Sequence, residues 1–289
     1  MEQKKEITVI GLGDMGAMLV RTLLEQGYKV TGWNRSTAKA SALVAQGMTL
    51  ASSVEQAVSA SETVMVCVTS YDVSRELLGT PEVTTALSGR TLVQLSSGTP
   101  KDARDDEAWA NANNIVYLDG AILAVPSQIG RQDALIFVSG SPAAYQASEA
   151  PLRALAGGLQ FMGEDPGTAS TWDMGFLSTL FGSVIGFLHG AKVFQSENIP
   201  VAALGNMVLQ AAHNLCEMLK NQGDVIQSGN YGNSESSLDI CTNGMDLFLR
   251  QAQETGINAD IPAFIKSIFK RGQDAGYGSE QLAAVFKVL

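Results

Sequence analysis

The first half of the chain alternates between short apolar runs rich in β-branched residues and longer stretches with helical spacing of apolar positions. Strands are expected at Ile7–Gly11, Lys29–Trp33, Thr63–Val68, Thr91–Leu95, Val116–Asp119 and Ala134–Ser139. Helices are expected between them, including Met15–Gln26, Thr37–Gln46, Asp72–Leu78 and Lys101–Asn113. Because strands that alternate with helices are joined by right-handed crossovers, the pattern predicts a doubly wound, mainly parallel sheet in an α/β fold.

The pattern changes near Gly163-Glu164-Asp165-Pro166-Gly167, where glycine and proline end regular structure. Beyond this point we expect only helices, at about 168–196, Pro200–Gln222, Ser234–Thr255, Ile261–Ala275 and Ser279–Val288, with Ser279 as a helix cap. The sequence therefore predicts an N-terminal sheet domain over residues 1–164 and an all-helical domain over residues 165–289. The long helix at about 168–196 would connect the two domains.

The apolar run Met174–Leu188 needs an interpretation of its own. A membrane span needs about 20 apolar residues, whereas this run is shorter and lies between Asp173 and His189. We interpret it as a helix covered by protein rather than as a membrane segment. Small residues recur at every fourth position, which lets another backbone approach one helical face: Ser178, Gly182, Gly186 and Gly190. Since the second domain is short, we expect a partner subunit to supply part of the cover, giving an intertwined homodimer.

Composition narrows the function classes. The chain has 289 residues, 45% of them hydrophobic and 17% charged, so it can bury a sizeable core. Its net charge of −10 disfavours nucleic-acid binding. The N-terminus lacks the pattern of a secretory signal, and Cys67, Cys216 and Cys241 are odd in number and widely spaced. We therefore expect a cytoplasmic protein with reduced thiols, and neither the cysteines nor the two histidines suggest a metal site.

The first strand leads directly into the sequence Gly11-Leu12-Gly13-Asp14-Met15-Gly16. In a dinucleotide-binding turn with this spacing, the first glycine permits the tight turn, the second lets the backbone approach a pyrophosphate, and the third lets the helix pack on the sheet. The N–H groups at the start of the helix then bind phosphate. A purely structural glycine turn is the alternative, but the position between a strand and a helix favours a Rossmann-type dinucleotide site.

The end of the second strand indicates which cofactor binds. NAD enzymes usually carry an acid there, whereas this chain has Trp33-Asn34-Arg35-Ser36-Thr37-Ala38-Lys39. Arg35 and Lys39 suit a 2′-phosphate, so we predict NADP(H), although a solvated basic turn is the alternative. Ser97 follows another strand, and it faces either the nicotinamide or the substrate, or it belongs only to an ordinary turn. The predicted cofactor contacts are Gly11, Leu12, Gly13, Asp14, Met15, Gly16, Asn34, Arg35, Ser36, Lys39, Val68, Thr69 and Ser97.

Together these features resemble the β-hydroxyacid dehydrogenase superfamily and, within it, the imine reductases, which include the reductive aminases. Besides the glycine motif, the resemblance is carried by Gly27-Tyr28-x-Val30-x-x-Trp33-Asn34-Arg35, Ser97-Gly98-Thr99-Pro100, Asp119–Pro126, Phe187-Leu188-His189 and Gly276-Tyr277-Gly278. It covers essentially the whole chain. It implies an NADPH-dependent oxidoreductase that reduces C=N bonds by hydride transfer and takes a small imine or amine as its ligand.

Asp173 is the catalytic residue that the resemblance implies. The hydroxyacid dehydrogenases carry a lysine on the interdomain helix, but here Asp173 takes that position, and no lysine occurs between Lys101 and Lys192. A carboxylate would attract a cationic iminium, whereas a protonated Asp173 would donate a proton to a neutral imine. Both roles stay open, as does a purely structural acid at a helix start.

Other positions depart from the pattern of reductive aminases that couple amines with ketones efficiently. Those enzymes tend to carry asparagine at Ser97, tyrosine at Phe181 and a Met-Gln pair at Ile240-Cys241, so we expect reduction of preformed imines more than coupling. The predicted substrate pocket comprises Val125, Trp172, Leu177, Phe181, Ala211, Ile240 and Cys241. Two alternative functions are a β-hydroxyacid-type dehydrogenase, which the missing lysine disfavours, and a non-enzymatic NADP-binding protein.

Overall fold

A computed structural model describes residues 5–232 and 236–289 of the chain. It divides into two compact units, Met1–Ser178 and Thr179–Leu289. The long helix α8 (Gly167–Ser196) begins in the first unit and continues into the second. Each unit is described by itself below.

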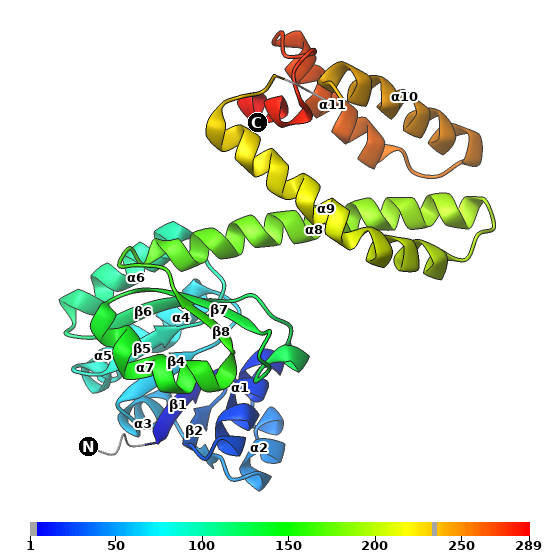
Figure 1. The fold of residues 1–289 in the computed structure, drawn as a ribbon. Coiled ribbons are helices and arrows are strands. Elements are labelled where there is room, and N and C mark those ends of the chain that lie inside the picture. Colours follow the sequence, from blue (N-terminus) through cyan, green and yellow to red (C-terminus); the bar gives the residue numbers. More distant parts are fainter. Residues whose placement is uncertain (1–4, 233–235) are drawn as a thin grey trace. The chain divides into compact units, whose positions relative to one another are not determined.

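The first unit is built on one eight-stranded sheet with the order β3-β2-β1-β4-β5-β6-β7-β8 (Figure 1). Adjacent strands pair in parallel except β6 and β7, which are antiparallel. The prediction of a mainly parallel, doubly wound sheet is therefore confirmed. The strands are β1 (Glu6–Ile10), β2 (Lys29–Trp33), β3 (Thr49–Leu50), β4 (Thr63–Val66), β5 (Thr91–Gln94), β6 (Val116–Ile122), β7 (Leu135–Gly140) and β8 (Gly158–Phe161).

Helices cover both faces of this sheet, which explains why its central strands are apolar on both sides. The core on one face includes Leu19 and Leu23 of α1 and Leu152 of α7. The core on the other face includes Val58 of α3 and Leu87 of α5. The helices of this unit are α1 (Asp14–Glu25), η1 (Thr37–Lys39), α2 (Ser41–Ala45), α3 (Val54–Ser59), α4 (Tyr71–Leu78), α5 (Pro81–Leu87), α6 (Pro100–Ala112), η2 (Pro126–Gln128) and α7 (Pro142–Leu155).

The second unit is helical in its described residues, as predicted. After α8 come α9 (Val201–Ser228), α10 (Leu238–Thr255), α11 (Asp260–Asp274) and the 3₁₀ helix η3 (Leu282–Val288). Helices α9 and α10 end at Gly229 and Gly256, whose φ angles of +69° and +70° give left-handed caps.

Three helix predictions need correction. The predicted helix Thr37–Gln46 is split into η1 and α2, and α9 continues past the predicted end at Gln222. The last segment is a 3₁₀ helix capped at Gln281, not an α-helix capped at Ser279, because Gln281 forms an isolated bridge with Ser237. The predicted start of the third helix, Ser234, lies outside the described residues.

Helix α8 is covered by its own chain only near its start. Its buried residues all lie in its first two turns: Gly167, Ala169, Ser170 and Asp173. The following apolar residues are exposed, including Phe176, Leu180, Phe181, Val184, Ile185 and Leu188. Within the described residues, α8 is the one helix long and apolar enough to cross a membrane, by length and composition alone. The expected cover by a partner subunit would fall on these exposed residues, and it stays a prediction.

Candidate active site

The turn between β1 and α1 has the backbone that the glycine spacing predicts. Gly11 has a φ of +96°, and a Cβ added to it would lie 2.2 Å from the Cys67 carbonyl oxygen. A Cβ on Gly16 would lie 2.0 Å from the Gly11 carbonyl oxygen, so α1 packs directly against the turn. A Cβ on Gly13, in contrast, would have no atom within 4 Å. The constraints on Gly11 and Gly16 are thus structural, whereas Gly13 keeps the space beside the turn open.

A cavity of about 400 Å³ opens beside this turn. Helix α1 starts after Gly13 without a side-chain cap, which leaves its first N–H groups available to phosphate oxygens. The cavity brings together many of the predicted cofactor residues: Gly11, Gly13, Asp14, Met15, Gly16, Asn34, Arg35, Val68 and Thr69. Four further residues that we did not predict complete its lining: Trp33, Cys67, Val73 and Leu77. The shape and donors of this cavity suit a dinucleotide.

Asn34 acts within the protein rather than as a free polar group. Its Oδ1 accepts the Leu12 N–H at 3.0 Å, and its Nδ2 donates to the Ser36 carbonyl oxygen at 2.9 Å. The side chain therefore fixes the glycine turn against the loop after β2. Leu12 is buried and contributes this backbone contact, while Ser36 caps η1 and lies outside the cavity lining.

Arg35 reaches the cavity, but an acid stands beside it. Its Nη2 lies 3.8 Å from Glu76 Oε2, and both side chains are more than two-thirds exposed, at 71% and 73%. An exposed pair at this distance is weak, so a 2′-phosphate can displace it. Lys39 ends the short helix η1 and is exposed outside the cavity lining.

Two neighbouring serines just after β5 have different surroundings, and the assignment of Ser97 to the cofactor stays a prediction. Ser97 is exposed and does not line the cavity. Ser96 is buried, and its Oγ accepts the Val68 N–H at 3.0 Å at the cavity edge. Strand β5 ends just before this point, so a buried strand-end position was the signal that would have identified Ser96.

The start of α8 is fixed to the sheet by several independent contacts. Ser139 Oγ, on β7, donates to the Pro166 carbonyl oxygen and accepts the Ala169 N–H, each at 2.8 Å. Asp165 forms two bonds with the Arg104 guanidinium, at 3.0 and 2.8 Å. These contacts explain why the glycine- and proline-containing break is followed by an ordered helix rather than a loose linker.

Asp173 lies on this anchored part of α8. It is only 7% exposed, and among the described residues its carboxylate forms no hydrogen bond or ion pair. Burial raises the pKa of Asp173 above its usual value. A buried carboxyl group without a partner is unfavourable for folding, so this group is a strong candidate for contact with a ligand.

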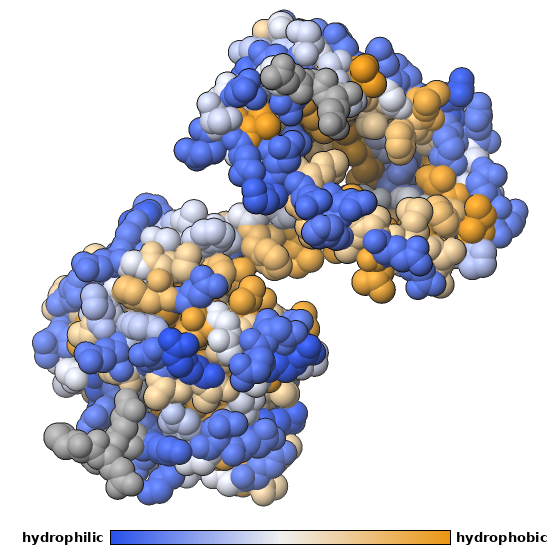
Figure 2. Space-filling model, in the orientation of Figure 1, coloured by the Kyte–Doolittle hydropathy of each residue, from blue (hydrophilic) through white to orange (hydrophobic). Residues whose placement is uncertain are grey.

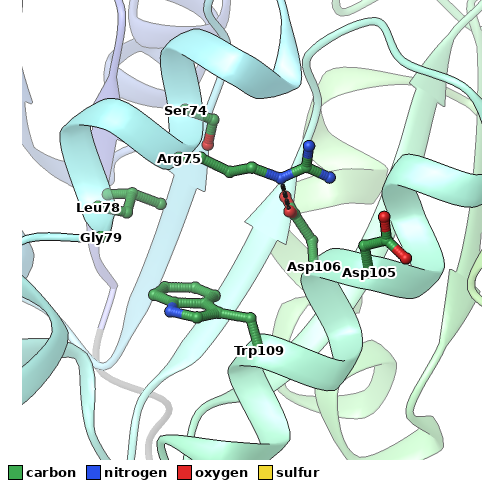
Figure 3. Close-up of a pocket in the computed structure, with 7 residues that line it drawn as sticks. All are labelled: Ser74, Arg75, Leu78, Gly79, Asp105, Asp106 and Trp109. Carbon is green, nitrogen blue, oxygen red and sulfur yellow. Dashed lines mark hydrogen bonds and ion pairs between the residues drawn. The ribbon is translucent and has the colours of Figure 1, made fainter.

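A second cavity, of about 260 Å³, lies between α4 and α6 (Figure 3). Arg75 Nε donates to Asp106 at 2.6 Å, and Arg75 Nη1 donates to Asp102 at 3.3 Å. Figure 3 shows the Arg75–Asp106 pair bridging α4 and α6 above the Trp109 ring. Because the charge of Arg75 is already neutralised, we assign the pair to holding α4 in place.

Comparisons with known proteins agree with this geometry. Residues 6–163 match the NAD binding domain of 6-phosphogluconate dehydrogenase, and residues 165–289 match the C-terminal domain of the NADPH-dependent reductive aminase-like family. An NADPH-dependent reductive aminase from Aspergillus oryzae is 32% identical over 98% of this chain and 96% of its own. The chain belongs to the imine reductase and reductive aminase family.

Solved structures of this imine reductase family are similar over the whole chain. An imine reductase from Myxococcus stipitatus in complex with NADP⁺ has a TM-score of 0.92 at 33% identity, covering 98% of this chain and 99% of its own. A reductive aminase from Aspergillus terreus in complex with NADPH and ethyl levulinate has a TM-score of 0.92 at 28% identity, covering 98% of each chain. The family resemblance read from the sequence is confirmed.

The residues predicted to form the imine reductase substrate pocket fall in both units of the chain. Val125, Trp172 and Leu177 belong to the first unit, where the Trp172 ring meets Phe137 edge-on at 5.6 Å between centroids. The second unit holds Phe181, Ala211, Ile240 and Cys241. Val125, Trp172, Phe181 and Ile240 are each more than half exposed. Their assignment to one pocket stays a prediction.

Proposed function

We propose that this protein is an NADPH-dependent imine reductase that converts imines or iminium ions to amines. The observation that carries the proposal is Asp173: a buried carboxyl group without a partner among the described residues, on a helix that has no lysine before Lys192 near its far end. Membership of the imine reductase family and the dinucleotide-shaped cavity at Gly11–Gly16 support it.

The cofactor is NADPH, whose nicotinamide supplies a hydride to the C=N carbon. The residues of this chain fit it: open N–H groups at the start of α1 suit the pyrophosphate, and the Arg35 guanidinium suits the 2′-phosphate. Asn34 holds the two loops that carry these groups at a fixed separation. Relatives described with NADP⁺ and NADPH support the same assignment.

Asp173 serves the substrate in one of two ways. Burial raises its pKa, so Asp173 keeps a proton to higher pH than an exposed aspartate does, and the protonated acid can donate that proton to the nitrogen of an imine as the hydride arrives. A substrate that is already a cation lowers the pKa again, and the carboxylate then holds the cation by charge. In both cases, the product is the amine, and no lysine is needed to polarise an oxygen.

The first assay follows the loss of NADPH absorbance with a small cyclic imine. The second follows the appearance of NADPH absorbance when NADP⁺ is supplied with a panel of β-hydroxyacids. We expect imine-dependent NADPH oxidation and no reaction with the hydroxyacids. Turnover of hydroxyacids would instead identify a β-hydroxyacid dehydrogenase, and NADPH binding without any turnover would identify a non-enzymatic binding protein.

We further propose that two copies form an intertwined homodimer through α8. A Cβ on Gly182 or Gly186 would have no atom within 4 Å, so the small-residue stripe is open at these two positions in the single chain, whereas a Cβ on Gly190 would lie 3.3 Å from Leu204 Cδ2. The exposed apolar residues beside it need cover, and part of the apolar surface of the helical unit is visible in Figure 2. The partner's helices would complete the substrate pocket. We also propose a cytoplasmic location, since all three cysteines are unpaired.

A further inference from the structure

A second acid, Asp119, lies in the middle of β6 and is completely buried. Its carboxylate accepts three hydroxyl hydrogen bonds. Tyr71 donates to Oδ1, Tyr117 donates to the same oxygen at 3.2 Å, and Ser170 donates to Oδ2 at 2.8 Å. Burial of a carboxylate is costly, so an arrangement with three donors around one acid indicates a specific task.

The first donor leads to the nucleotide cavity. Tyr71 is the first residue of α4 and comes directly after the Val68-Thr69-Ser70 segment, whose first two residues line that cavity. Its ring packs against Gly98 so closely that a Cβ there would lie 2.2 Å from Tyr71 Cδ2. The Arg75 pair with Asp106 holds the same helix to α6. Tyr71 itself does not line the cavity, but it holds the start of α4, whose Val73 and Leu77 form part of the cavity wall.

Another of the three donors, Ser170, connects Asp119 to the helix turn that carries Asp173. Ser170 lies in the first turns of α8, one turn before Asp173, and both belong to its buried face. Ser139 and Asp165 already anchor the helix start, so the Asp119–Ser170 bond is not required merely to attach α8 to the sheet. It instead sets the rotation of the turn that carries Asp173.

We propose that Asp119 is a positioning residue for the reaction. By binding Ser170 and Tyr71 together, it fixes Asp173 relative to the wall of the nucleotide cavity. This inference rests on the proposed function, because it requires that Asp173 acts on the substrate. Asp119 itself touches neither the cofactor cavity nor the substrate residues.

Ser170→Ala is the sharpest test, since it removes one hydroxyl and leaves Asp119 with two donors. The matched control is Ser148→Ala: Ser148 is also a buried helical serine, but its hydroxyl bonds within its own helix, to the Ala144 carbonyl oxygen. We expect Ser170→Ala to lower kcat for imine reduction about tenfold, because small displacements of a reacting group are costly. The KM for NADPH should change less than about twofold, and Ser148→Ala should leave kcat unchanged.

A double-mutant cycle distinguishes positioning from a general structural role. In an Asp173→Asn background, adding Ser170→Ala should lower kcat by less than about twofold further, because the residue being positioned is already disabled. Tyr71→Phe, which keeps the ring against Gly98, should behave in the same way if Ser170→Ala fails to fold. Independent, multiplying losses would show a merely structural role and overturn the inference.

Two failures remain distinguishable. If Asp173→Asn lowers kcat but Ser170→Ala and Tyr71→Phe do not, the positioning role is wrong and the proposed function stands. If Asp173→Asn itself leaves kcat unchanged, the assignment of the acid fails and the positioning role fails with it.

Discussion

The two ends of helix α8 have opposite surroundings. In its first turns, Gly167 is packed so tightly that an added Cβ would lie 2.7 Å from Arg104 Cζ, and Asp173 is buried. Further along, Gly182 and Gly186 face open space, and Phe181 is 61% exposed. The first part is covered by its own chain and holds the proposed acid, whereas the second part is largely exposed and is the surface that the proposed dimer would cover.

The same contrast separates the cofactor from the substrate. The nucleotide cavity is formed entirely within the first unit, and its glycine turn, Arg35 and Asn34 are held by contacts inside that unit. The residues predicted for the substrate are divided between the two units and are largely exposed. One subunit therefore carries the residues for NADPH, and the proposed dimer predicts that imine reduction needs assembly.

The largest effect is expected where the second part of α8 is blocked. Gly186→Leu places a large side chain on the open stripe, so it should prevent close approach of the partner helix, dissociate the dimer and abolish most imine reduction. Sedimentation at micromolar concentration, together with NADPH binding, measures both consequences. Gly186→Ala is the matched control and should assemble normally, since alanine is still small. A fully active wild-type monomer would contradict the proposal that the second part of α8 needs cover from a partner.

Next in size is the loss of the acid in the first part. Asp173→Asn keeps the size of the side chain but removes its charge, and should lower imine reduction roughly tenfold or more. A fall mainly in kcat would indicate proton donation, and a rise mainly in KM would indicate binding of the cation. NADPH affinity should change little. Asp133→Asn, an exposed acid paired with Arg131, serves as the control. Near-full activity of Asp173→Asn across several imines would contradict the proposed role of Asp173.

Sequence reasoning succeeded where the chemistry is local. The spacing of Gly11, Gly13 and Gly16 fixes a backbone conformation, and that conformation alone creates the open cavity beside α1. The alternation of strands and helices likewise predicted the sheet, because each strand must be apolar on both faces. Strands β3 and β8 were missed; β3 has only two residues, too few to show a pattern.

It failed where the outcome depends on contacts far along the chain. Nothing local indicates that Ser96 meets Val68, because that contact depends on the pairing of β4 with β5. The last helix became 3₁₀ through the bridge between Gln281 and Ser237, which no periodicity reveals. The family resemblance pointed to Asp173, but its isolation from other polar groups is a property of the packed structure.

A smaller effect is expected at the cofactor's 2′-phosphate. Arg35→Ala should raise the KM for NADPH roughly tenfold, as expected for the loss of a charge-assisted contact, and should change the KM for NADH much less. Steady-state kinetics with both cofactors and one imine give the comparison. Equal losses with the two cofactors would show that Arg35 has a structural role only.

The smallest predicted effect concerns the acid beside Arg35. Glu76 lies 3.8 Å from the Arg35 guanidinium and is largely exposed, so it both competes for the arginine and repels a phosphate. Glu76→Gln removes the charge and keeps the shape of the side chain. Exposed ion pairs are worth about 0.2–1 kcal/mol, so the KM for NADPH should fall by about 1.4- to fivefold, while that for NADH stays the same. Because the interaction is screened by salt, the gain should shrink as ionic strength rises.

Glu82→Gln, which removes an exposed acid from α5, controls for the change in net charge. An equal gain from Glu82→Gln would mean that net charge alone is responsible, and no gain from Glu76→Gln would mean that the 2′-phosphate binds away from Arg35.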